Sequence, residues 1–194
     1  MEKNDYGLMI KKGRNTNMED LPLYLTFDDV LLLPQYSDFS LTEIMLETNL
    51  TENIQLKIPV VAAPMDKVCE SALALVLGKL GGVGIIHRNQ PIEQQVKQIK
   101  EVIKQDVITG AAIGVGVDFE DRLKALVNAG TRIICIDSGR GYSAEVIRAV
   151  GIIKKQYTVE VIAGNVATYE GALALFQAGA DALRVGKGAG GLYL

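Results

Sequence analysis

Short apolar runs alternate with helix-length segments between residues 59 and 186. The intervening segments cover residues 68–80, 91–104, 118–129, 143–156 and 168–178, and they predict five helices. Near-continuous apolar runs of this length are typical of parallel strands that are covered on both faces, joined by right-handed crossovers. The pattern predicts six such strands, at PVVAA (59–63), VGIIH (83–87), AAIGVGV (111–117), RIICID (132–137), VEVIAGN (159–165) and ALRVG (182–186).

The same pattern repeats along the chain. Similar stretches begin at Leu77, Leu126 and Leu175, a constant spacing of 49 residues. Each period holds two strand–helix pairs, so one unit has roughly 25 residues, close to the unit of a (β/α)₈ barrel. We expect the recurring glycines of this repeat to end helices in the left-handed conformation, and they are Gly81, Gly130 and Gly179.

The predicted fold class is therefore α/β, an incomplete (β/α)₈ TIM-barrel type with about six strand–helix units. A barrel of eight would need two more units. A doubly wound open sheet is the competing architecture, although no G-x-G-x-x-G follows the first predicted strand. We expect residues 1–20 to form a flexible N-terminal lead-in and residues 21–194 to form one partial barrel domain. Within it, residues 21–58 predict non-repetitive structure or a small hairpin.

Composition narrows the class of protein further. The chain has 194 residues, of which 48% are hydrophobic and 22% are charged, and this combination excludes intrinsic disorder. A net charge of −3 argues against nucleic-acid binding, which depends on clustered lysine and arginine. The N-terminus lacks the apolar region of a signal peptide, and no apolar run reaches the roughly 18 residues of a membrane span. With only two cysteines, Cys69 and Cys135, we expect a reduced, cytoplasmic setting without a membrane partner.

Polar and glycine residues gather where the predicted strands end. The ends of parallel strands meet at one edge, where α/β folds place their sites. Glycine-rich loops let backbone N–H groups approach a phosphate, and a carboxylate can bind a ribose diol, so the pattern predicts a nucleotide pocket. Ordinary turn chemistry is the alternative explanation. The segments are Ala63–Asp66, His87–Asn89, Gly114 and Gly116, Asp137–Tyr142, Gly164–Asn165 and Gly186–Gly191.

The sequence predicts structural roles for the other reactive residues. His87, the only histidine, follows a buried strand, and without clustered cysteines or carboxylates it would make no zinc site. Cys69 and Cys135 lie in apolar stretches and are expected to pack in the core. The sequence contains no G-x-S-x-G motif, and the loop with Lys187 lacks the G-K-[ST] of a P-loop.

Several longer motifs resemble the IMP dehydrogenase / GMP reductase family. The resemblance covers about 170 residues, and it is closest to IMP dehydrogenase, with GMP reductase as the alternative. It implies a (β/α)₈ barrel, a purine-nucleotide substrate, NAD as cofactor, and oxidation of IMP to XMP in guanine nucleotide biosynthesis. It also implies a homo-oligomer. The motifs are LTFDDVLLLP (25–34), IPVVAAPMDKVCE (58–70), GGVGIIHRNQPIEQQ (81–95), ICIDSGRGYS (134–143), VIAGNVAT (161–168) and DALRVGKGAG (181–190).

The resemblance also assigns roles to individual positions. The cofactor side would hold Asp137, Ser138 and Gly186. Backbone carbonyls of Gly188 and Gly190 would hold a monovalent cation such as potassium. The implied substrate-binding residues are Met65, Asn165, Arg184, Gly188, Gly190 and Gly191.

The chain departs from the family pattern where the chemistry is done. Tyr193 stands at the position of the family's nucleophilic cysteine. Gly191 and Ala63 stand at two positions where the family has a phosphate-binding serine. Residues 105–110 leave no room for the CBS modules. The last two barrel units, the flap and its general base are also missing. Tyrosine has a pKa near 10 and does not replace a thiolate, so we expect no turnover. A nucleotide-binding or self-associating protein without catalysis is the alternative.

Overall fold

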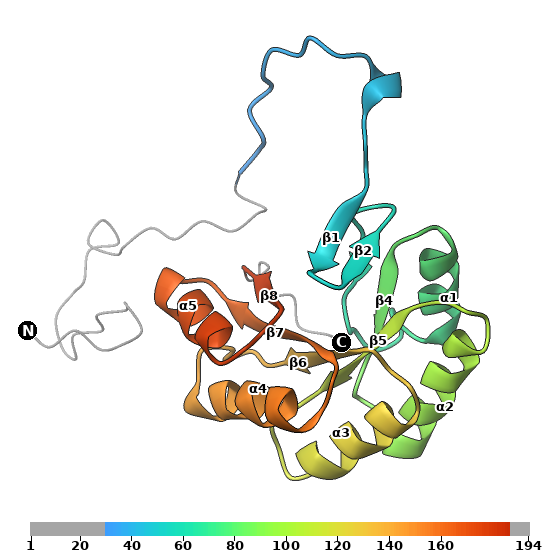
Figure 1. Ribbon diagram of the computed structural model, residues 1–194, viewed down its shortest axis with the longest axis vertical. Coiled ribbons are helices and arrows are strands. Elements are labelled where there is room, and N and C mark those ends of the chain that lie inside the picture. Colours follow the sequence, from blue (N-terminus) through green and yellow to red (C-terminus); the bar gives the residue numbers. More distant parts are fainter. Residues whose placement is uncertain (1–29, 187–194) are drawn as a thin grey trace, which may run out of the picture. The chain divides into compact units, whose positions relative to one another are not determined.

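A parallel six-stranded sheet forms the centre of the structure, which is a computed structural model describing residues 30–186. The chain divides into two compact units, and the sheet belongs to the unit of residues 36–187. Neighbouring strands are hydrogen-bonded in chain order, so the predicted parallel arrangement is confirmed (Figure 1). The strands are β3 (Val61–Ala62), β4 (Val83–Ile86), β5 (Thr109–Ile113), β6 (Ile133–Asp137), β7 (Glu160–Val166) and β8 (Ala182–Val185).

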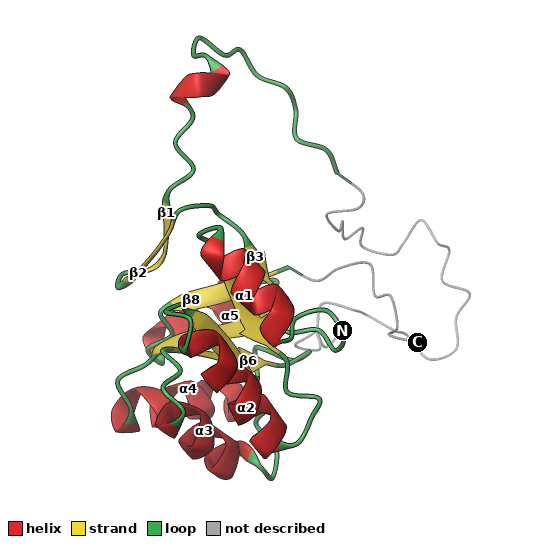
Figure 2. Ribbon diagram, turned by 90° about the vertical axis from the view of Figure 1, so that its right-hand side faces the viewer, coloured by secondary structure: helices red, strands yellow, loops and turns green. Residues whose placement is uncertain are grey.

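Five helices connect these strands and lie along the outer side of the curled sheet (Figures 1 and 2). A serine caps the N-terminus of the helix over residues 144–156, because the hydroxyl of Ser143 accepts a hydrogen bond from the N–H of Val146. Three helices end before a glycine with φ of 93° to 103°, as the repeat predicts for Gly81, Gly130 and Gly179. The helices are α1 (Ser71–Lys79), α2 (Ile92–Ile103), α3 (Phe119–Asn128), α4 (Ala144–Gln156) and α5 (Tyr169–Gln177).

Two apolar clusters lie on opposite faces of the sheet. The outer cluster joins side chains from all five helices to strand residues such as Ile86, Ile113 and Ile136. The inner cluster contains Ile85 and Ile133 together with residues of a small hairpin. Because every helix packs on one face, the doubly wound alternative is wrong, and the curled sheet is an incomplete barrel.

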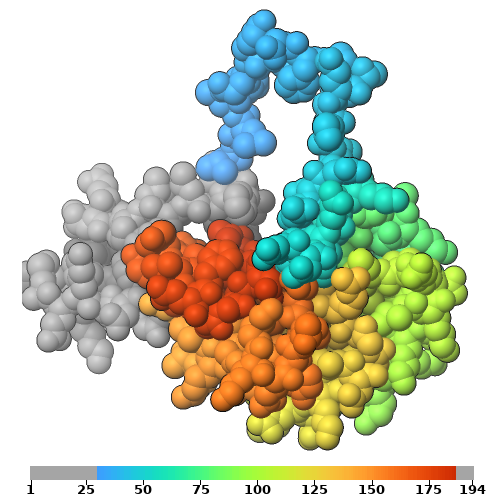
Figure 3. Space-filling model, viewed as in Figure 1, coloured from blue at the N-terminus to red at the C-terminus, as the bar shows by residue number. Residues whose placement is uncertain are grey.

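The hairpin covers the inner face near the amino ends of the strands. It comprises β1 (Thr48–Thr51) and β2 (Ile54–Leu56), and a short 3₁₀ turn, η3 (Leu41–Glu43), precedes it. Ile54 and Leu56 are buried in the inner cluster. The N–H of Lys57 donates to the carbonyl of Gly81 over 2.8 Å. In Figure 3 the hairpin, in cyan, lies between the red atoms of the last described segments and the green atoms of the segments that follow the hairpin in the chain.

The observed elements are close to those predicted. The third strand is the exception, because it begins at Thr109 and ends at Ile113, so the glycines Gly114 and Gly116 lie in the following loop. None of the helices in residues 30–186 is long and apolar enough to cross a membrane.

Candidate functional site

Asp137, at the carboxyl end of β6, is the centre of a charged group. Its Oδ1 accepts a hydrogen bond from Nη1 of Arg184 on β8. Gly164 of β7 pairs with both residues in the sheet. A Cβ at that position would lie 2.7 Å from Cβ of Arg184, so a side chain there would disturb the ion pair.

A second arginine approaches the same carboxylate from the other side. Nε of Arg88, which follows β4, lies 3.7 Å from Oδ2 of Asp137. To reach it the guanidinium passes Gly114, where a Cβ would lie 3.1 Å from its Nη1. Two guanidinium groups around one carboxylate leave a local net charge of +1. This edge therefore attracts anions.

Burial changes the acid–base properties of the neighbouring side chains. Burial would lower the pKa of Arg184, but the nearby Cys135 and Asp137 side chains outweigh it and raise the pKa, so the guanidinium stays charged. Burial raises the pKa of Cys135 to about 12, against a smaller lowering by Arg184. It also raises the pKa of Cys69 to about 11. Both cysteines are buried, neutral thiols in the core, as predicted, and neither supplies a thiolate near neutral pH.

The ends of β6, β7 and β8 are joined by further hydrogen bonds. Nδ2 of Asn165 donates to the carbonyl of Gly186 over 3.0 Å. The N–H of Asn165 donates to the carbonyl of Ser138, whose own N–H donates to the carbonyl of Gly164. The structure therefore brings five of the predicted residues to one edge, namely Asp137, Ser138, Asn165, Arg184 and Gly186.

The remaining predicted residues are not part of this group. Met65 lies after β3, at the far side of the sheet in strand order, and its carbonyl accepts from the N–H groups of Val68 and Cys69. Within residues 30–186, no hydrogen bond or ion pair joins Met65 to Asp137. The predicted positions Gly188, Gly190, Gly191 and Tyr193 lie outside the described residues.

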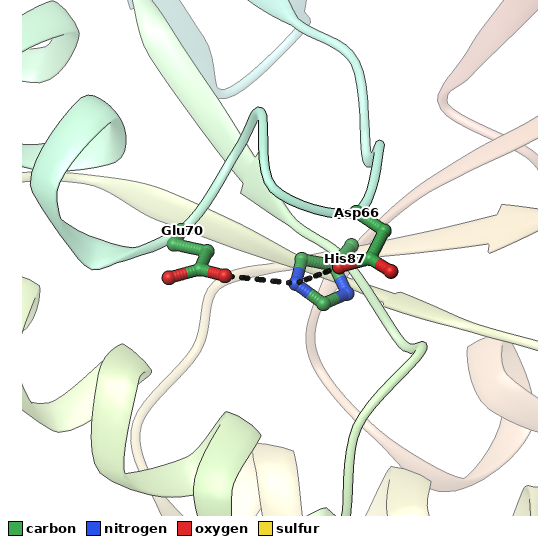
Figure 4. A group of neighbouring side chains, drawn as sticks. All are labelled: Asp66, Glu70 and His87. Carbon is green, nitrogen blue, oxygen red and sulfur yellow. Dashed lines mark ion pairs between the residues drawn. The ribbon is translucent and has the colours of Figure 1, made fainter. Parts of the chain in front are cut away.

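Two carboxylates lie beside the single histidine, so the prediction that His87 has no carboxylate neighbours is wrong. Its buried Nε2 lies 3.7 Å from Oδ1 of Asp66 and 3.6 Å from Oε1 of Glu70 (Figure 4). All three residues belong to the first two strand–helix units. The sequence signal was available, because Asp66 and His87 follow strands that pair in the sheet.

This group has the composition of a metal site, since its ligand atoms lie within 4.8 Å of one another. The protonation of His87 argues against a metal. Its Nδ1 accepts a hydrogen bond from the N–H of Asn89 over 3.2 Å, so in the neutral ring Nε2 carries the proton. A protonated Nε2 has no lone pair for a metal and instead points its N–H toward the carboxylates. We therefore assign a structural role to His87.

Two cavities lie away from the carboxyl ends of the strands. One of about 130 Å³ is lined by Ile103, Asp106 and Arg132 near the amino ends of β5 and β6. The other, of about 250 Å³, lies between α3 and α4 beside Lys124 and Tyr157. Neither contains a residue predicted to bind a ligand.

Arg88 and Gly114 lie in segments that the strand-end pattern placed at the predicted nucleotide pocket, but the sequence assigned neither residue a role of its own. Both stand in segments that follow buried strands, which is the available signal. The sequence does not show that Arg88 crosses β5 to reach Asp137, because this depends on the curl of the sheet.

Known proteins have sequences similar to that of this chain. The family model of the IMP dehydrogenase / GMP reductase domain matches residues 24–193. Inosine-5'-monophosphate dehydrogenase of Cryptosporidium parvum is 35% identical over 87% of this chain and 52% of its own length. The protein of the same name from Borreliella burgdorferi is 35% identical over 87% of this chain and 54% of its own length.

A third relative, the inosine-5'-monophosphate dehydrogenase of Aquifex aeolicus, is 29% identical over 87% of this chain and 61% of its own length. The chain thus spans about half to three fifths of the length of these curated relatives. The family match covers most of the chain, including all six strands of the sheet. The chain belongs to the IMP dehydrogenase / GMP reductase family.

Proposed function

We propose that the carboxyl edge of the sheet binds a purine nucleotide and NAD, in the manner of an IMP dehydrogenase domain. The observation that carries this proposal is the position of Asp137 between Arg88 and Arg184. The names of the relatives favour IMP over other purine nucleotides and the dehydrogenase over the reductase.

The residues at this edge suit both ligands. Oδ2 of Asp137 has only the 3.7 Å contact with Arg88 in the ion pairs of the described residues, so it can accept a hydrogen bond from a ribose hydroxyl. The excess positive charge balances phosphate groups. Asn165 and Arg184 would face the substrate, with Met65 beside the base, while Asp137, Ser138 and Gly186 would face the cofactor. NAD supplies a hydride acceptor when bound.

We further propose that this chain binds these ligands without turning them over. The family reaction begins with attack of a cysteine thiolate on the purine, and Tyr193 stands at that position. The two cysteines of the chain are buried thiols whose raised pKa keeps them neutral. Loss of a catalytic nucleophile lowers kcat by several orders of magnitude.

Calorimetric titration of the chain with IMP, GMP and NAD tests the binding. We expect measurable heat for IMP or NAD and at least a tenfold weaker affinity in Asp137→Asn. The matched control is Asp121→Asn on the exposed side of α3, which should bind as the parent does. Absorbance of NADH tests the chemistry, with no turnover expected. Heat that is absent, or unchanged in Asp137→Asn, contradicts the binding site, and turnover at ordinary enzyme rates contradicts the role of Tyr193.

A further inference from the structure

A buried arginine joins the neighbouring helices α2 and α3 to the loop that follows β4 (Figure 1). Arg122 on α3 is buried, although its side chain carries a charge. Its Nε donates to Oδ2 of Asp118 over 2.6 Å, and its Nη1 donates to Oε1 of Gln95 on α2 over 2.7 Å. Its Nη2 donates to the backbone carbonyl of Gln90 over 3.1 Å. Each guanidinium nitrogen therefore has a partner, and one of these partners belongs to the loop.

Gln90 is the residue through which this network holds the loop. Nε2 of Gln98 on α2 donates to its side-chain oxygen over 2.9 Å. The side-chain amide of Gln90 donates to the carbonyl of His87 over 2.8 Å, and its backbone N–H donates to the carbonyl of Arg88 over 2.8 Å. Together with the bond from α3, these contacts hold both the backbone and the side chain of Gln90. Residues 87–90 are thereby held as one turn.

Gln95 connects the same network to the sheet. Gln95 is fully buried, and its Nε2 donates to the carbonyl of Ile86 at the end of β4 over 3.2 Å and to that of Ala112 on β5 over 2.8 Å. A buried polar network whose members have their hydrogen-bond partners rigidifies the structure around it. The strand ends, the two helices and the loop thus form one connected set of hydrogen bonds.

The loop that this network holds carries Arg88, whose guanidinium approaches Asp137. Nε of Arg88 is shielded from solvent and lies 3.7 Å from Oδ2 of Asp137. The path is narrow, because a Cβ at Gly114 would lie 3.1 Å from Nη1 of Arg88. A small shift of the loop would therefore move the charge away from the carboxylate or press it against the segment after β5.

Arg122 is too enclosed to bind an anion itself. Its charge is balanced by Asp118, and within residues 30–186 no hydrogen bond or ion pair joins it to Arg88 or Asp137. The planar guanidinium donates in several fixed directions from three nitrogen atoms, whereas a lysine carries its donors on one nitrogen. An arginine can therefore reach a helix, a second helix and a loop at the same time.

We propose that Arg122 is a positioning residue for the anion-binding edge. Arg122 sets the loop of residues 87–90 and thereby places the guanidinium of Arg88 beside Asp137. This inference rests on the proposed function, in which that edge binds a purine nucleotide and NAD. Because Arg122 acts on ligand binding through Arg88, its removal should lower the affinity only while Arg88 is present.

Calorimetric titration with IMP and with NAD, in two backgrounds, tests this route. Arg122→Met keeps most of the length of the side chain and removes its donors. We expect it to weaken binding about fivefold in the parent chain but less than about twofold in an Arg88→Ala background, because two residues that act in series are not additive. The matched control is Leu126→Ala, one turn further along α3, which removes buried apolar contacts outside the network. It should lower the melting temperature and leave both affinities unchanged.

Gln90→Met is a second, milder test made in the loop itself. This substitution removes the side-chain bonds with Gln98 and His87 and leaves the bond from Arg122 to the backbone. Because the position is half-buried, we expect this variant to fold even where Arg122→Met does not. Its loss of affinity should show the same dependence on Arg88.

NMR of the arginine side chains separates this proposal from the proposed function. In the isotope-labelled chain, the Nε–H signal of Arg88 is identified by its loss in Arg88→Ala. We expect this proton to exchange with solvent at least about fivefold faster in Arg122→Met and Gln90→Met than in the parent or in Leu126→Ala, since Nε is shielded only while the loop is held. If this signal responds as expected and the parent binds neither ligand, the proposed function fails and the placement of Arg88 stands.

Two results would overturn the proposal. The first is an Arg88 signal that Arg122→Met and Gln90→Met leave as it is in the parent. The second is a loss of affinity on Arg122→Met that is equal with and without Arg88, which would leave Arg122 with a structural role alone.

Discussion

Asp137 and Arg184 are paired across an intervening strand, because β7 contributes only Gly164 between them. The pair joins the fourth strand of the sheet to the sixth at their carboxyl ends. A Cβ at Gly164 would lie 2.6 Å from the carbonyl oxygen and 2.7 Å from Cβ of Arg184, so a larger residue there would displace Arg184. The proposed site thus depends on a glycine that has no functional group of its own.

The ion pair should contribute to stability. Asp137→Asn keeps the shape of the side chain and removes the charge, which leaves the half-buried Arg184 without its main partner. We expect the free energy of unfolding to fall by about 1–2 kcal/mol, measured by urea denaturation. Asp121→Asn, on the exposed side of α3, should change it by less than about 0.5 kcal/mol. Equal effects of the two substitutions would contradict the assigned pair.

The two thiols should be inert in the folded chain. At pH 8, a disulfide reagent such as dithiodipyridine should react with Cys69 and Cys135 slowly under native conditions and rapidly in concentrated guanidinium, since reaction requires an accessible thiolate. Two rapidly titrated thiols in the native chain would show that the cysteines are accessible.

The raised pKa values of these two thiols predict that the free energy of unfolding falls at alkaline pH. Their pKa values are raised from 9.0 to about 11 and about 12 on folding, so between pH 9 and 12 the unfolded chain loses protons that the folded chain retains. The contribution of these thiols to the free energy of unfolding is therefore fully present below pH 9 and declines as the pH rises above 9. Urea denaturation from pH 8 to 11 should show this decline, and it should be smaller in the Cys69→Ala/Cys135→Ala variant. An equal pH dependence in both proteins would be inconsistent with buried neutral thiols.

Two glycine-to-alanine substitutions should have opposite effects. At Gly84 in β4, a Cβ would lie 2.6 Å from Cα of Ala74, so α1 would have to move away from the sheet. We expect a loss of about 1–3 kcal/mol. At Gly151 within α4 a Cβ meets no atom within 4 Å, so Gly151→Ala should stabilise the chain by about 0.5–1 kcal/mol. Thermal denaturation distinguishes the two, and a neutral Gly84→Ala would show that α1 packs less closely.

Zinc should not stabilise the chain through His87. With Nδ1 accepting the N–H of Asn89, binding of a metal at Nε2 would require the ring proton to move from Nε2 to Nδ1, and this move would break the hydrogen bond with Asn89. Addition of zinc in modest excess over protein should therefore leave the melting temperature unchanged. A rise that Glu70→Gln abolishes would restore the metal interpretation.

The hydrophobic pattern was sufficient to predict the sheet, because every strand is an apolar run and the four central strands, β4 to β7, are almost entirely buried. It was not sufficient for buried polar residues. Gln95 on α2 is fully buried, and its amide donates to the carbonyls of Ile86 and Ala112. Arg122 on α3 is also buried and donates to Oε1 of Gln95. A polar side chain in the sequence predicts an exposed position. Only the three-dimensional arrangement shows the hydrogen-bond partners that allow these two side chains to be buried.

The site was predicted only in part for a similar reason. Asp137, Asn165 and Arg184 follow from the motifs, whereas the approach of Arg88 depends on the curl of the sheet. The carboxylates around His87 come from the turn after β3 and the start of α1, so their convergence requires the pairing of β3 with β4.

The hairpin makes the two ends of the curled sheet different, because it covers only the end where the strands begin. Ile54 and Leu56 occupy the inner face near the strand beginnings, and Nδ2 of Asn53 donates to Oε1 of Glu160 where β7 starts. This end of the curled sheet is thereby plugged by the chain's own apolar side chains. A ligand of this sheet is therefore expected at the opposite end, where the strands finish.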